Sequence, residues 1–498
     1  MPHPLFTKKP LKMLLEEAEG ENRLRRCLGP VSLTSLGIGA IIGTGIFVLT
    51  GIAAHDKTGP ALVLSFVAAG IACIFAALCY AEFASLTPVA GSAYTYAYAT
   101  LGELFAWIMG WDLILEYSVA SASVAHGWSH YFQNFIGIFH LKLPFVLTRA
   151  PFDYFPETGK IALTGTFFDL PAIVITLIIT LLLIKGVKES SVVNNAIVIT
   201  KIAVVVLVIV AGAFFIDPAN WKPFAPFGYT GVSFFGKTIL GQTGFGGEPL
   251  GMLAGAAMIF FAYIGFDSLS THVEEARNPK RDVPVGIISS LLICTVLYIG
   301  VSFVLTGMVS YQKINIDAPV ADAFAQVGLP GVQFIISIGA IAGITSVLLV
   351  MMLSQPRILY VMSRDGMIPE SFFGAVHSRF RTPYKSTILT GIFVALGAAF
   401  MPLRILAELV NIGTLLAFII VCAAVLIVRQ TNPEARASFR TPFYPIIPIL
   451  GILTNLLLMF SLPMENWLRL GTWLAVGLLI YFLYSRKRTV MAKLRNRN

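Results

Sequence analysis

Twelve apolar runs, each of eighteen or more residues, set the strongest constraint on how this chain can fold. A helix crosses the roughly 30 Å hydrocarbon core of a bilayer with about 20 apolar residues. The runs are too long for the strands of a membrane barrel, which alternate in polarity and contain about ten residues. They cover residues 31–53, 60–86, 103–133, 167–185, 191–216, 251–272, 284–310, 331–361, 385–402, 405–429, 442–462 and 466–485. The pattern predicts an all-α integral membrane protein with twelve transmembrane helices.

The composition agrees with a membrane protein. Hydrophobic residues make up 56% of the chain and charged residues only 12%, whereas soluble domains contain about 25% charged residues. The first run is longer than the apolar core of a signal peptide and follows about thirty mostly polar residues, so we expect a true span. The five cysteines show no CxxC spacing, which argues against a disulfide framework or a zinc site.

The basic residues indicate the orientation of the chain in the membrane. Of 35 lysines and arginines, 24 lie on one predicted side and nine lie in the loops opposite. The larger group occupies residues 1–30, 185–188, 277–281, 364–385, 429–440 and 486–497. Because basic loops stay on the cytoplasmic side, both termini are predicted to be cytoplasmic in a multi-pass protein of the cell membrane. The net charge of +9 therefore gives no reason to expect nucleic acid.

Two spans contain features that interrupt a helix. The first contains Gly37, Gly39, Gly43 and Gly45, and each glycine weakens a helix by about 1 kcal/mol relative to alanine. Small residues at such spacing also permit close helix packing, which is the alternative interpretation. The sixth span has a counterpart in the sequence FAYIGFD, residues 261–267. Broken helices at positions one and six favour two five-span halves of inverted topology with a binding site between them.

The two predicted breaks specify a ligand. Free backbone N–H groups of Gly43, Thr44 and Gly45 would begin the outer half of the first span, where a carboxylate is favoured. Carbonyl groups released at the breaks suit an ammonium group, and these belong to Ala40 or Ile41 and to Phe261, Ala262 and Ile264. A carboxylate beside an ammonium group is an α-amino acid.

At these residues the chain resembles the amino acid–polyamine–organocation superfamily, and most closely the bacterial members of its cationic amino acid transporter family. The matching stretches occur in order along spans one to ten, which makes the match specific. They are GTGIF (43–47), YAEFASLTP (80–88), GSAYTY (91–96), GFD (265–267), EEARNPKR (274–281), RILYVMSRDG (357–366) and LVNIGTLLAF (409–418). The resemblance implies a proton-coupled or exchanging permease. In such a permease spans one, two, six and seven move against spans three, four, eight and nine.

The predicted organisation follows from the spans and the resemblance. Two helices, eleven and twelve, lie outside the repeats. In chain order we expect a cytoplasmic segment (1–30), a first inverted repeat (31–216), an extracellular loop (217–250), a second repeat (251–429), helices eleven and twelve (430–485) and a cytoplasmic tail (486–498).

Lys201 is a candidate for proton coupling. It lies about ten residues into span five, too deep for its ammonium group to reach the membrane surface easily. Burial favours the neutral amine, so this lysine can release and take up a proton during transport. By resemblance, Lys201 occupies the place where sodium-coupled relatives of the fold bind an ion and would contact the broken first span. We therefore expect proton coupling in preference to sodium coupling.

Three further residues are candidates for specificity. Glu116 and Asp267 could face the pocket and attract a cationic side chain. They could instead be structural, capping a free backbone group or pairing within the protein, and the sequence favours neither alternative. Met351 lies in the middle of span eight, where methionine is usually ordinary packing. If Met351 faces the pocket, it would narrow the pocket and favour small amino acids.

The sequence shows no catalytic set and calls for no cofactor. His126 and His130 are spaced for a metal, but no third ligand is evident, so no metal is expected. We predict a secondary transporter, not an enzyme, that imports cationic or small neutral L-amino acids by alternating access, with the substrate, a proton and membrane lipid as its partners. An exchanger, a polyamine transporter and an amino-acid sensor are the alternatives. Protein partners cannot be read from the sequence.

Overall fold

The computed structural model is mostly helical, as the apolar runs predict. It describes residues 4–10, 13, 28–86, 92–155, 160–186, 191–234, 237–244, 247–431 and 437–495. These ranges leave out most of the predicted N-terminal segment and Cys27. They also leave out residues 87, 88 and 91, which belong to two of the matching stretches. The α-helices are α2 (Pro30–Ile41), α3 (Thr50–Ala53), α4 (Leu62–Leu86), α5 (Ser92–Thr100), α6 (Glu103–Ile138), α7 (Leu170–Lys185), α8 (Ser191–Ala213), α9 (Met252–Ile259), α10 (Pro279–Met308), α11 (Pro319–Gln326), α12 (Pro330–Arg364), α13 (Glu370–Phe373), α14 (Tyr384–Phe400), α15 (Leu403–Thr431), α16 (Ile446–Phe460), α17 (Met464–Leu483) and α18 (Val490–Arg495).

Each of the twelve predicted ranges coincides with helical residues. Among the described residues, seven helical stretches are long and apolar enough to cross a membrane, and α2, α7, α14 and α16 are shorter apolar helices. The chain is therefore a multi-pass membrane protein, while the count of twelve crossings stays a prediction. Several helices begin with proline in the first turn, where its missing N–H leaves no hydrogen bond unmade; α2, α7, α10, α11 and α12 are examples.

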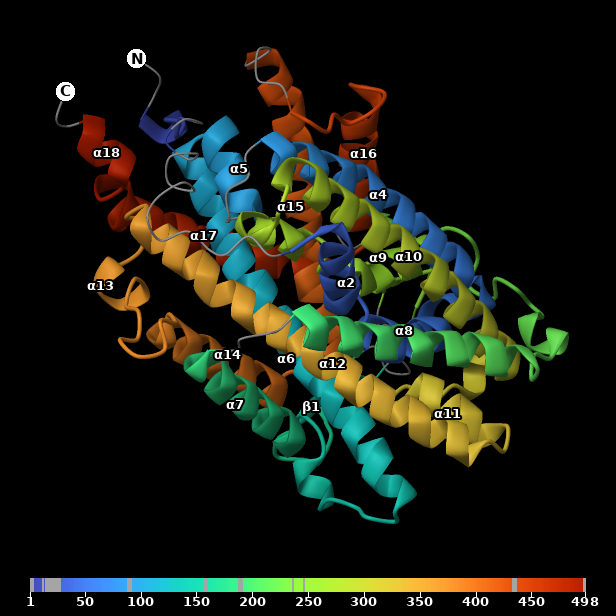
Figure 1. Ribbon diagram of the computed structural model, residues 1–498. Helices are drawn as coiled ribbons and strands as arrows, with labels where there is room; N and C mark the ends of the chain where they lie inside the picture. The colour runs from blue at the N-terminus through green and yellow to red at the C-terminus, as the bar shows by residue number, and fades with distance from the viewer. Residues whose placement is uncertain are drawn as a thin grey trace.

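The long helices form two packed groups (Figure 1). The helix α10 packs along α4 and α2, and α9 also lies against α4. In the second group α6 packs against α12 and α7, while α14 packs against α7, α6 and α12. These groups contain the same spans that the resemblance divides into a moving and a fixed part, although the inverted repeat itself stays a prediction.

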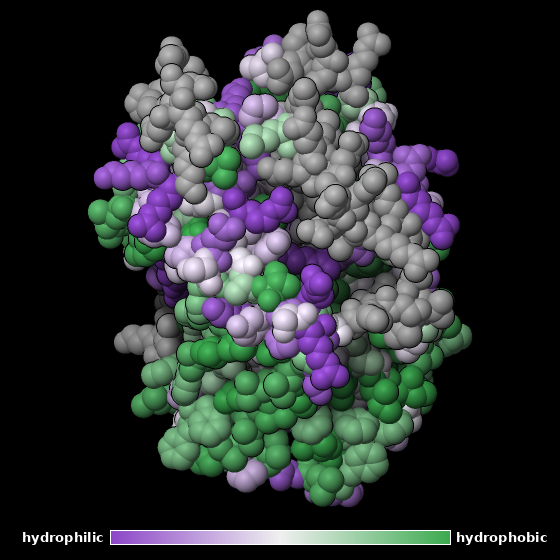
Figure 2. All heavy atoms as spheres, turned by 60° about the vertical axis from the view of Figure 1, so that its left-hand side comes forward, coloured by the Kyte–Doolittle hydropathy of each residue, from purple (hydrophilic) through white to green (hydrophobic). Residues whose placement is uncertain are grey.

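The surface suits a lipid environment. Figure 2 shows hydrophobic side chains over a broad lower zone of one face, with hydrophilic ones gathered toward the upper end. Large apolar side chains are exposed on the outward faces of several helices, including Leu181 of α7, Val210 of α8, Phe393 of α14 and Leu483 of α17. In water such a surface would be unfavourable, but lipid tails solvate it.

Both ends of the described chain lie on the same side of the molecule. The Nζ atom of Lys9 donates to the Oδ1 atom of Asp365 at 2.8 Å, and the backbone N–H of Val490 donates to the carbonyl oxygen of Asp365 at 3.0 Å. Asp365 is the residue directly after α12. The two ends therefore share one side of the molecule, while the cytoplasmic orientation of that side stays a prediction.

Two segments contain short antiparallel hairpins: the loop between predicted spans three and four, and the predicted extracellular loop 217–250. The first pairs β1 (Phe152–Phe155) with β2 (Lys160–Leu163). The second loop contains two pairs, β3 (Val232–Phe234) with β4 (Lys237–Leu240) and β5 (Gln242–Thr243) with β6 (Pro249–Leu250). The helix α6 continues to Ile138, so the first loop begins a few residues later than predicted.

The first predicted break is present. The helix α2 ends at Ile41, Ile42 is extended with ψ near 103°, and a π-helical segment runs from Gly45 to Leu49. A second π-helical segment, Ala54–Thr58, follows α3 and completes the outer half of this span. The helix therefore restarts at Thr44 and Gly45, where backbone N–H groups have no preceding turn to bond.

The second break lies in the sixth span. The helix α9 ends at Ile259 and tightens into a 3-10 turn (Phe260–Tyr263), after which Ile264 is extended and Gly265 has φ near +123°. A further 3-10 helix covers Asp267–Glu275. A positive φ is accessible to glycine at little cost, which explains why glycine occupies the turn between the two halves.

The two breaks touch each other. A Cβ atom placed on Gly45 would lie 2.3 Å from the Cα atom of Ala262, and one on Gly265 would lie 2.7 Å from the carbonyl oxygen of Ala40. Gly45 of the first break thus faces Ala262 of the second, and Gly265 of the second faces Ala40 of the first. Glycine is required there because the two backbones approach more closely than any side chain permits.

The close crossing gives a direct prediction for Gly45→Ala. The added methyl group has to push the two broken segments apart, and overpacking of this kind costs roughly 1–3 kcal/mol. We expect a lower thermal midpoint in detergent, measured as the loss of monodisperse protein after heating. Gly471→Ala in α17 is the matched control, because nothing lies within 4 Å of a Cβ atom at Gly471. An equal midpoint for both variants would contradict the close crossing.

Candidate functional site

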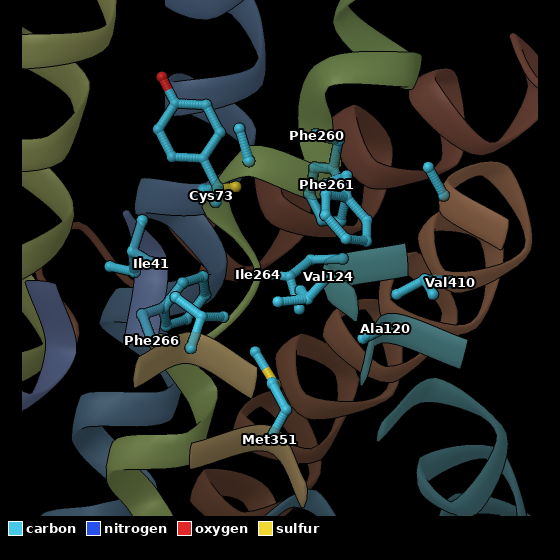
Figure 3. Packing of buried hydrophobic residues seen from close by; sticks show 14 of the residues in the cluster. Ile41, Cys73, Ala120, Val124, Phe260, Phe261, Ile264, Phe266, Met351 and Val410 are labelled. Atoms are coloured by element: carbon cyan, nitrogen blue, oxygen red, sulfur yellow. The ribbon is translucent and has the colours of Figure 1, made fainter. Parts of the chain in front are cut away.

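A small cavity lies where the two breaks meet α6 and α12 (Figure 3). Figure 3 shows Ile41, Phe261, Ile264, Val124 and Met351 gathered around this region. The volume of the cavity is about 10 Å³, room for about one water molecule. In this structure the cavity is too small for an amino acid, so a larger ligand requires the lining helices to separate. The lining residues are Ala40, Ile41, Gly43, Thr44, Gly45, Ala120, Val124, Phe261, Ile264, Val347 and Met351.

Most of the residues predicted for the site lie in this lining. From the first break these are Ile41, Gly43, Thr44 and Gly45, and from the second break Phe261 and Ile264. The lining also contains Met351. The remaining residue of the predicted set, Ala262, is absent from the lining, and its carbonyl oxygen instead accepts a hydrogen bond from the Tyr298 hydroxyl at 2.9 Å.

The wall opposite the breaks is apolar. Ala120 and Val124 come from α6, and Val347 and Met351 lie one turn apart on α12. The Thr44 side chain is the one polar side chain among the lining residues, and its hydroxyl donates to the carbonyl oxygen of Val124 at 3.5 Å. The cavity thus combines backbone polar groups on one side with hydrocarbon and a thioether on the other.

Tyr298 of α10 joins the two breaks. Its hydroxyl lies 2.9 Å from the carbonyl oxygens of both Ile41 and Ala262. One hydroxyl has a single proton, so it satisfies two buried acceptors only by sharing that proton between them. Nothing in the sequence indicated this role beyond a single polar atom within an apolar span.

Lys201 of α8 contacts the first break, as the resemblance implies. Its Nζ atom donates to the carbonyl oxygen of Gly39 at 2.7 Å and to that of Ile42 at 3.1 Å. The side chain is 1% exposed. Gly39 lies in the last turn of α2 and Ile42 is the residue directly after it. The carbonyl groups at the end of a helix have no hydrogen-bond partners within that helix. The lysine therefore stabilises the break by donating two hydrogen bonds to these carbonyl groups.

Neither Asp267 nor Glu116 is part of the cavity lining. The Asp267 carboxylate accepts hydrogen bonds from the backbone N–H of Gly265 at 3.1 Å and from the Tyr117 hydroxyl at 2.9 Å. It thus caps the second break, which is one of the two alternatives left open by the sequence. Glu116 is buried on α6 together with Asp112, whose carboxylate packs over Gly413 of α15.

Asn411 of α15 holds the other side of the second break. Its side-chain amide donates to the carbonyl oxygens of Ala257 at 2.8 Å and Met258 at 2.9 Å. These are carbonyls at the end of α9, which the break deprives of their helical partners. The residue lies in a stretch that carries the family resemblance, but its type alone does not reveal that it caps a helix on another span.

The two histidines of α6 pair with acids. The Nδ1 atom of His126 lies 2.8 Å from a carboxylate oxygen of Asp169, and that of His130 lies 3.6 Å from one of Asp317. Within the described residues no group of three or more histidine, cysteine or acidic side chains is arranged to hold a metal.

The comparisons with known proteins agree with this geometry. The sequence profile described as amino acid permease matches residues 28–481. The methylthioribose transporter of Bacillus subtilis (strain 168) is 48% identical over 489 residues, which cover 98% of this chain and 99% of the relative. The branched-chain amino acid permease BcaP of the same organism is 47% identical over 97% of this chain and 98% of the relative.

More distant relatives include plant proteins. The vacuolar cationic amino acid transporter 4 of Arabidopsis thaliana is 39% identical, and the match covers 84% of this chain and 65% of the relative. Family and relatives alike are transporters and not enzymes. The broken helices, the cavity between them and the sequence match lead to one conclusion: the chain belongs to the amino acid permease family of the amino acid–polyamine–organocation superfamily.

Proposed function

We propose that this permease imports neutral L-amino acids with apolar side chains by alternating access, coupled to protons. The observation that carries the proposal is the cavity, where backbone groups of two broken helices face a wall of Ala120, Val124, Val347 and Met351. Backbone groups suit the charges that all amino acids share, and the wall suits an aliphatic side chain.

The main chain of the substrate fits the two breaks. A helix N-terminus favours an anion, so the substrate carboxylate belongs at Gly43, Thr44 and Gly45. An ammonium group has three donors and requires acceptors. The carbonyl groups of Phe261 and Ile264 are the candidates, with those of Ile41 and Ala262 available when Tyr298 turns away.

The lining argues for a neutral side chain rather than a cationic one. None of the described residues that line the cavity is charged, and an unpaired charge in a low-dielectric site is strongly unfavourable. The carboxylate of Asp267 already bonds Tyr117 and Gly265. Similarity to BcaP, named for branched-chain amino acids, supports the same choice.

The contacts of Lys201 supply the proposed coupling. A protonated lysine donates to the carbonyls of Gly39 and Ile42 and holds the end of α2 in place. Loss of the proton removes the charge and weakens both hydrogen bonds. Proton release toward the cytoplasm would thus free α2 to move and open the inner side, which ties each transport cycle to a proton.

A thioether sugar is the second candidate substrate. The relative with 48% identity is named a methylthioribose transporter, and a methylthio group fits the apolar wall that includes Met351. Such a ligand carries neither an ammonium nor a carboxylate group, so it would leave the backbone groups at the two breaks without charged partners.

Uptake into proteoliposomes tests the proposed function. We expect accumulation of labelled leucine, isoleucine or valine when the outside is more acidic, and none without a gradient. Competition with arginine, spermidine and methylthioribose should be weak. Binding without uptake would identify a sensor, uptake only against internal amino acid an exchanger, and stronger competition by spermidine or methylthioribose would overturn the substrate assignment.

The Lys201→Ala variant separates coupling from transport. We expect it to lose gradient-driven accumulation and to retain counterflow of labelled leucine, because the binding groups remain while the proton carrier is gone. Lys313→Ala is the matched control and should behave like the parent protein, because Lys313 is an exposed lysine at the end of a short 3-10 helix between α10 and α11. A Lys201→Ala protein that remains fully gradient-driven would remove Lys201 from the mechanism.

The Met351→Ser variant tests the side-chain wall. A shorter side chain enlarges the cavity, and selectivity for one or two methylene groups is worth about tenfold or more. We expect longer amino acids, measured as competitors of leucine uptake, to improve by about tenfold relative to alanine. Met352→Ser is the control, because this neighbouring buried residue does not line the cavity. Equal size selectivity in both variants would contradict the role of Met351.

A further inference from the structure

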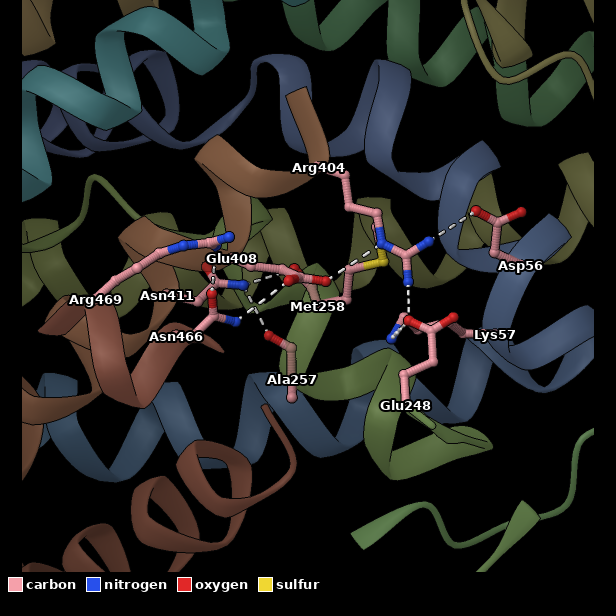
Figure 4. Close-up of polar contacts among 10 residues, drawn as sticks. All are labelled: Asp56, Lys57, Glu248, Ala257, Met258, Arg404, Glu408, Asn411, Asn466 and Arg469. Carbon is pink, nitrogen blue, oxygen red and sulfur yellow. Dashed lines mark hydrogen bonds and ion pairs between the residues drawn. The ribbon is translucent and has the colours of Figure 1, made fainter. Parts of the chain in front are cut away.

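A cluster of buried charges lies at the end of the molecule opposite the termini, apart from the cavity. It consists of Asp56, Lys57, Glu248, Arg404 and Glu408, and we call it the Arg404 cluster (Figure 4). Asp56 and Lys57 lie in the π-helical segment that completes the outer half of the first span, while Glu248 lies in the loop just before α9. Arg404 and Glu408 are in the first turns of α15.

Arg404 is the centre of this cluster. Its guanidinium group bonds a carboxylate oxygen of Glu248, lies 3.5 Å from an oxygen of Asp56 and lies 3.4 Å from an oxygen of Glu408. The Nζ atom of Lys57 is 3.5 Å from the same carboxylate oxygen of Glu248 that Arg404 contacts. The five charged groups thus form one connected network rather than separate pairs.

The network is shielded from solvent. The side chains of Arg404, Asp56, Glu248, Glu408 and Lys57 are between 3% and 9% exposed. Removing one partner of a buried ion pair leaves a charge without compensation, which is far less favourable than losing a surface pair. The cluster is therefore stable when complete and strongly weakened when any central member is neutralised.

The cluster joins three elements on the outer side of the cavity. It ties the outer half of the first span to the segment leading into α9, and ties both to α15. The backbone N–H of Gly251 also donates to the carbonyl oxygen of Lys57 at 2.9 Å. Below these contacts lie Thr44, Gly45 and Phe261, which line the cavity.

Glu408 is the partner of Arg404 within α15 itself. It lies on the same helix as Arg404, four residues away, and its other carboxylate oxygen accepts from the Asn466 side chain of α17 at 3.2 Å. If Arg404 separated from Asp56 and Glu248, Glu408 on the same helix would still compensate its charge.

We propose that the Arg404 cluster is an ionic latch that holds the outer entrance closed and opens when Arg404 releases Asp56 and Glu248 together. The idea rests on the proposed transport function only in that the cavity has to be reached from outside. It assigns the latch to residues from three segments that are far apart in the sequence, and it predicts that each of them controls the same opening.

Access of a thiol reagent from outside tests the latch. Ala120→Cys places a reporter in the cavity lining, and a membrane-impermeant methanethiosulfonate is added to intact cells. Protein without the reporter gives the background from the natural cysteines. We expect Arg404→Gln to raise the labelling rate of the reporter by about tenfold or more, because the population of the outward-open form increases. Arg469→Gln is the matched control, since Arg469 bonds Asn466 and not the acids around Arg404.

Two further sets of variants guard against a misfolded protein. Asp56→Asn and Glu248→Gln each remove one partner of Arg404 and should also raise the labelling rate. Arg404→Lys, which keeps a positive charge beside Asp56, Glu248 and Glu408, should give a rate between that of the parent and that of Arg404→Gln. Rates within about twofold of the parent in Arg404→Gln, Asp56→Asn and Glu248→Gln alike would overturn the latch. Labelling requires no transport, so a protein that changes its labelling but moves no amino acid would contradict the proposed function alone.

Discussion

Backbone groups in the interior of a membrane protein must find partners within the protein, and this constraint governs the centre of this molecule. Two helices are interrupted where no bulk water is available, and each unpaired group there costs several kcal/mol. Three of the side chains that meet this demand come from surrounding helices, namely Lys201, Tyr298 and Asn411. A fourth, Asp267, directly follows the second break on the same span.

The same constraint links binding to movement in our account. A substrate that brings an ammonium and a carboxylate group offers new partners to the backbone groups at the breaks. Tyr298 already shares its proton between Ile41 and Ala262, so a bound ammonium group would relieve it of one acceptor. The crossing point of the two backbones is then affected by the small cavity, by the proposed proton on Lys201 and by the proposed latch at Arg404.

The sequence predicted the parts of this arrangement that have a local pattern. Long apolar runs indicated the helices, and the glycines of residues 37–45 indicated the first break and most of its contribution to the cavity. The sequence did not reveal Tyr298 or Asn411 as partners of the breaks, because a single polar residue in an apolar span has no periodic signal. Whether Asp267 faces the cavity or caps a helix also depended on how the spans pack.

The Arg404 cluster shows the same limit on a larger scale. Arg404 lies 348 residues from Asp56 and 156 residues from Glu248 along the chain, and each looks like an ordinary loop or helix-end charge when read alone. Only the packing of α15 against the two outer half-helices buries them together. Local chemistry thus predicted the backbone features of the site, while the side chains that control those features required the fold.

The central claim is that the two breaks recognise the charged main chain of an amino acid, and counterflow in proteoliposomes measures this most directly. Proteoliposomes loaded with leucine would be offered labelled leucine together with 4-methylpentanoate, which lacks the ammonium group, or 3-methylbutylamine, which lacks the carboxylate. All three ligands carry similar branched hydrocarbon. Our account predicts that neither analogue competes appreciably while unlabelled leucine does. Competition by either analogue as strong as that by leucine would contradict it.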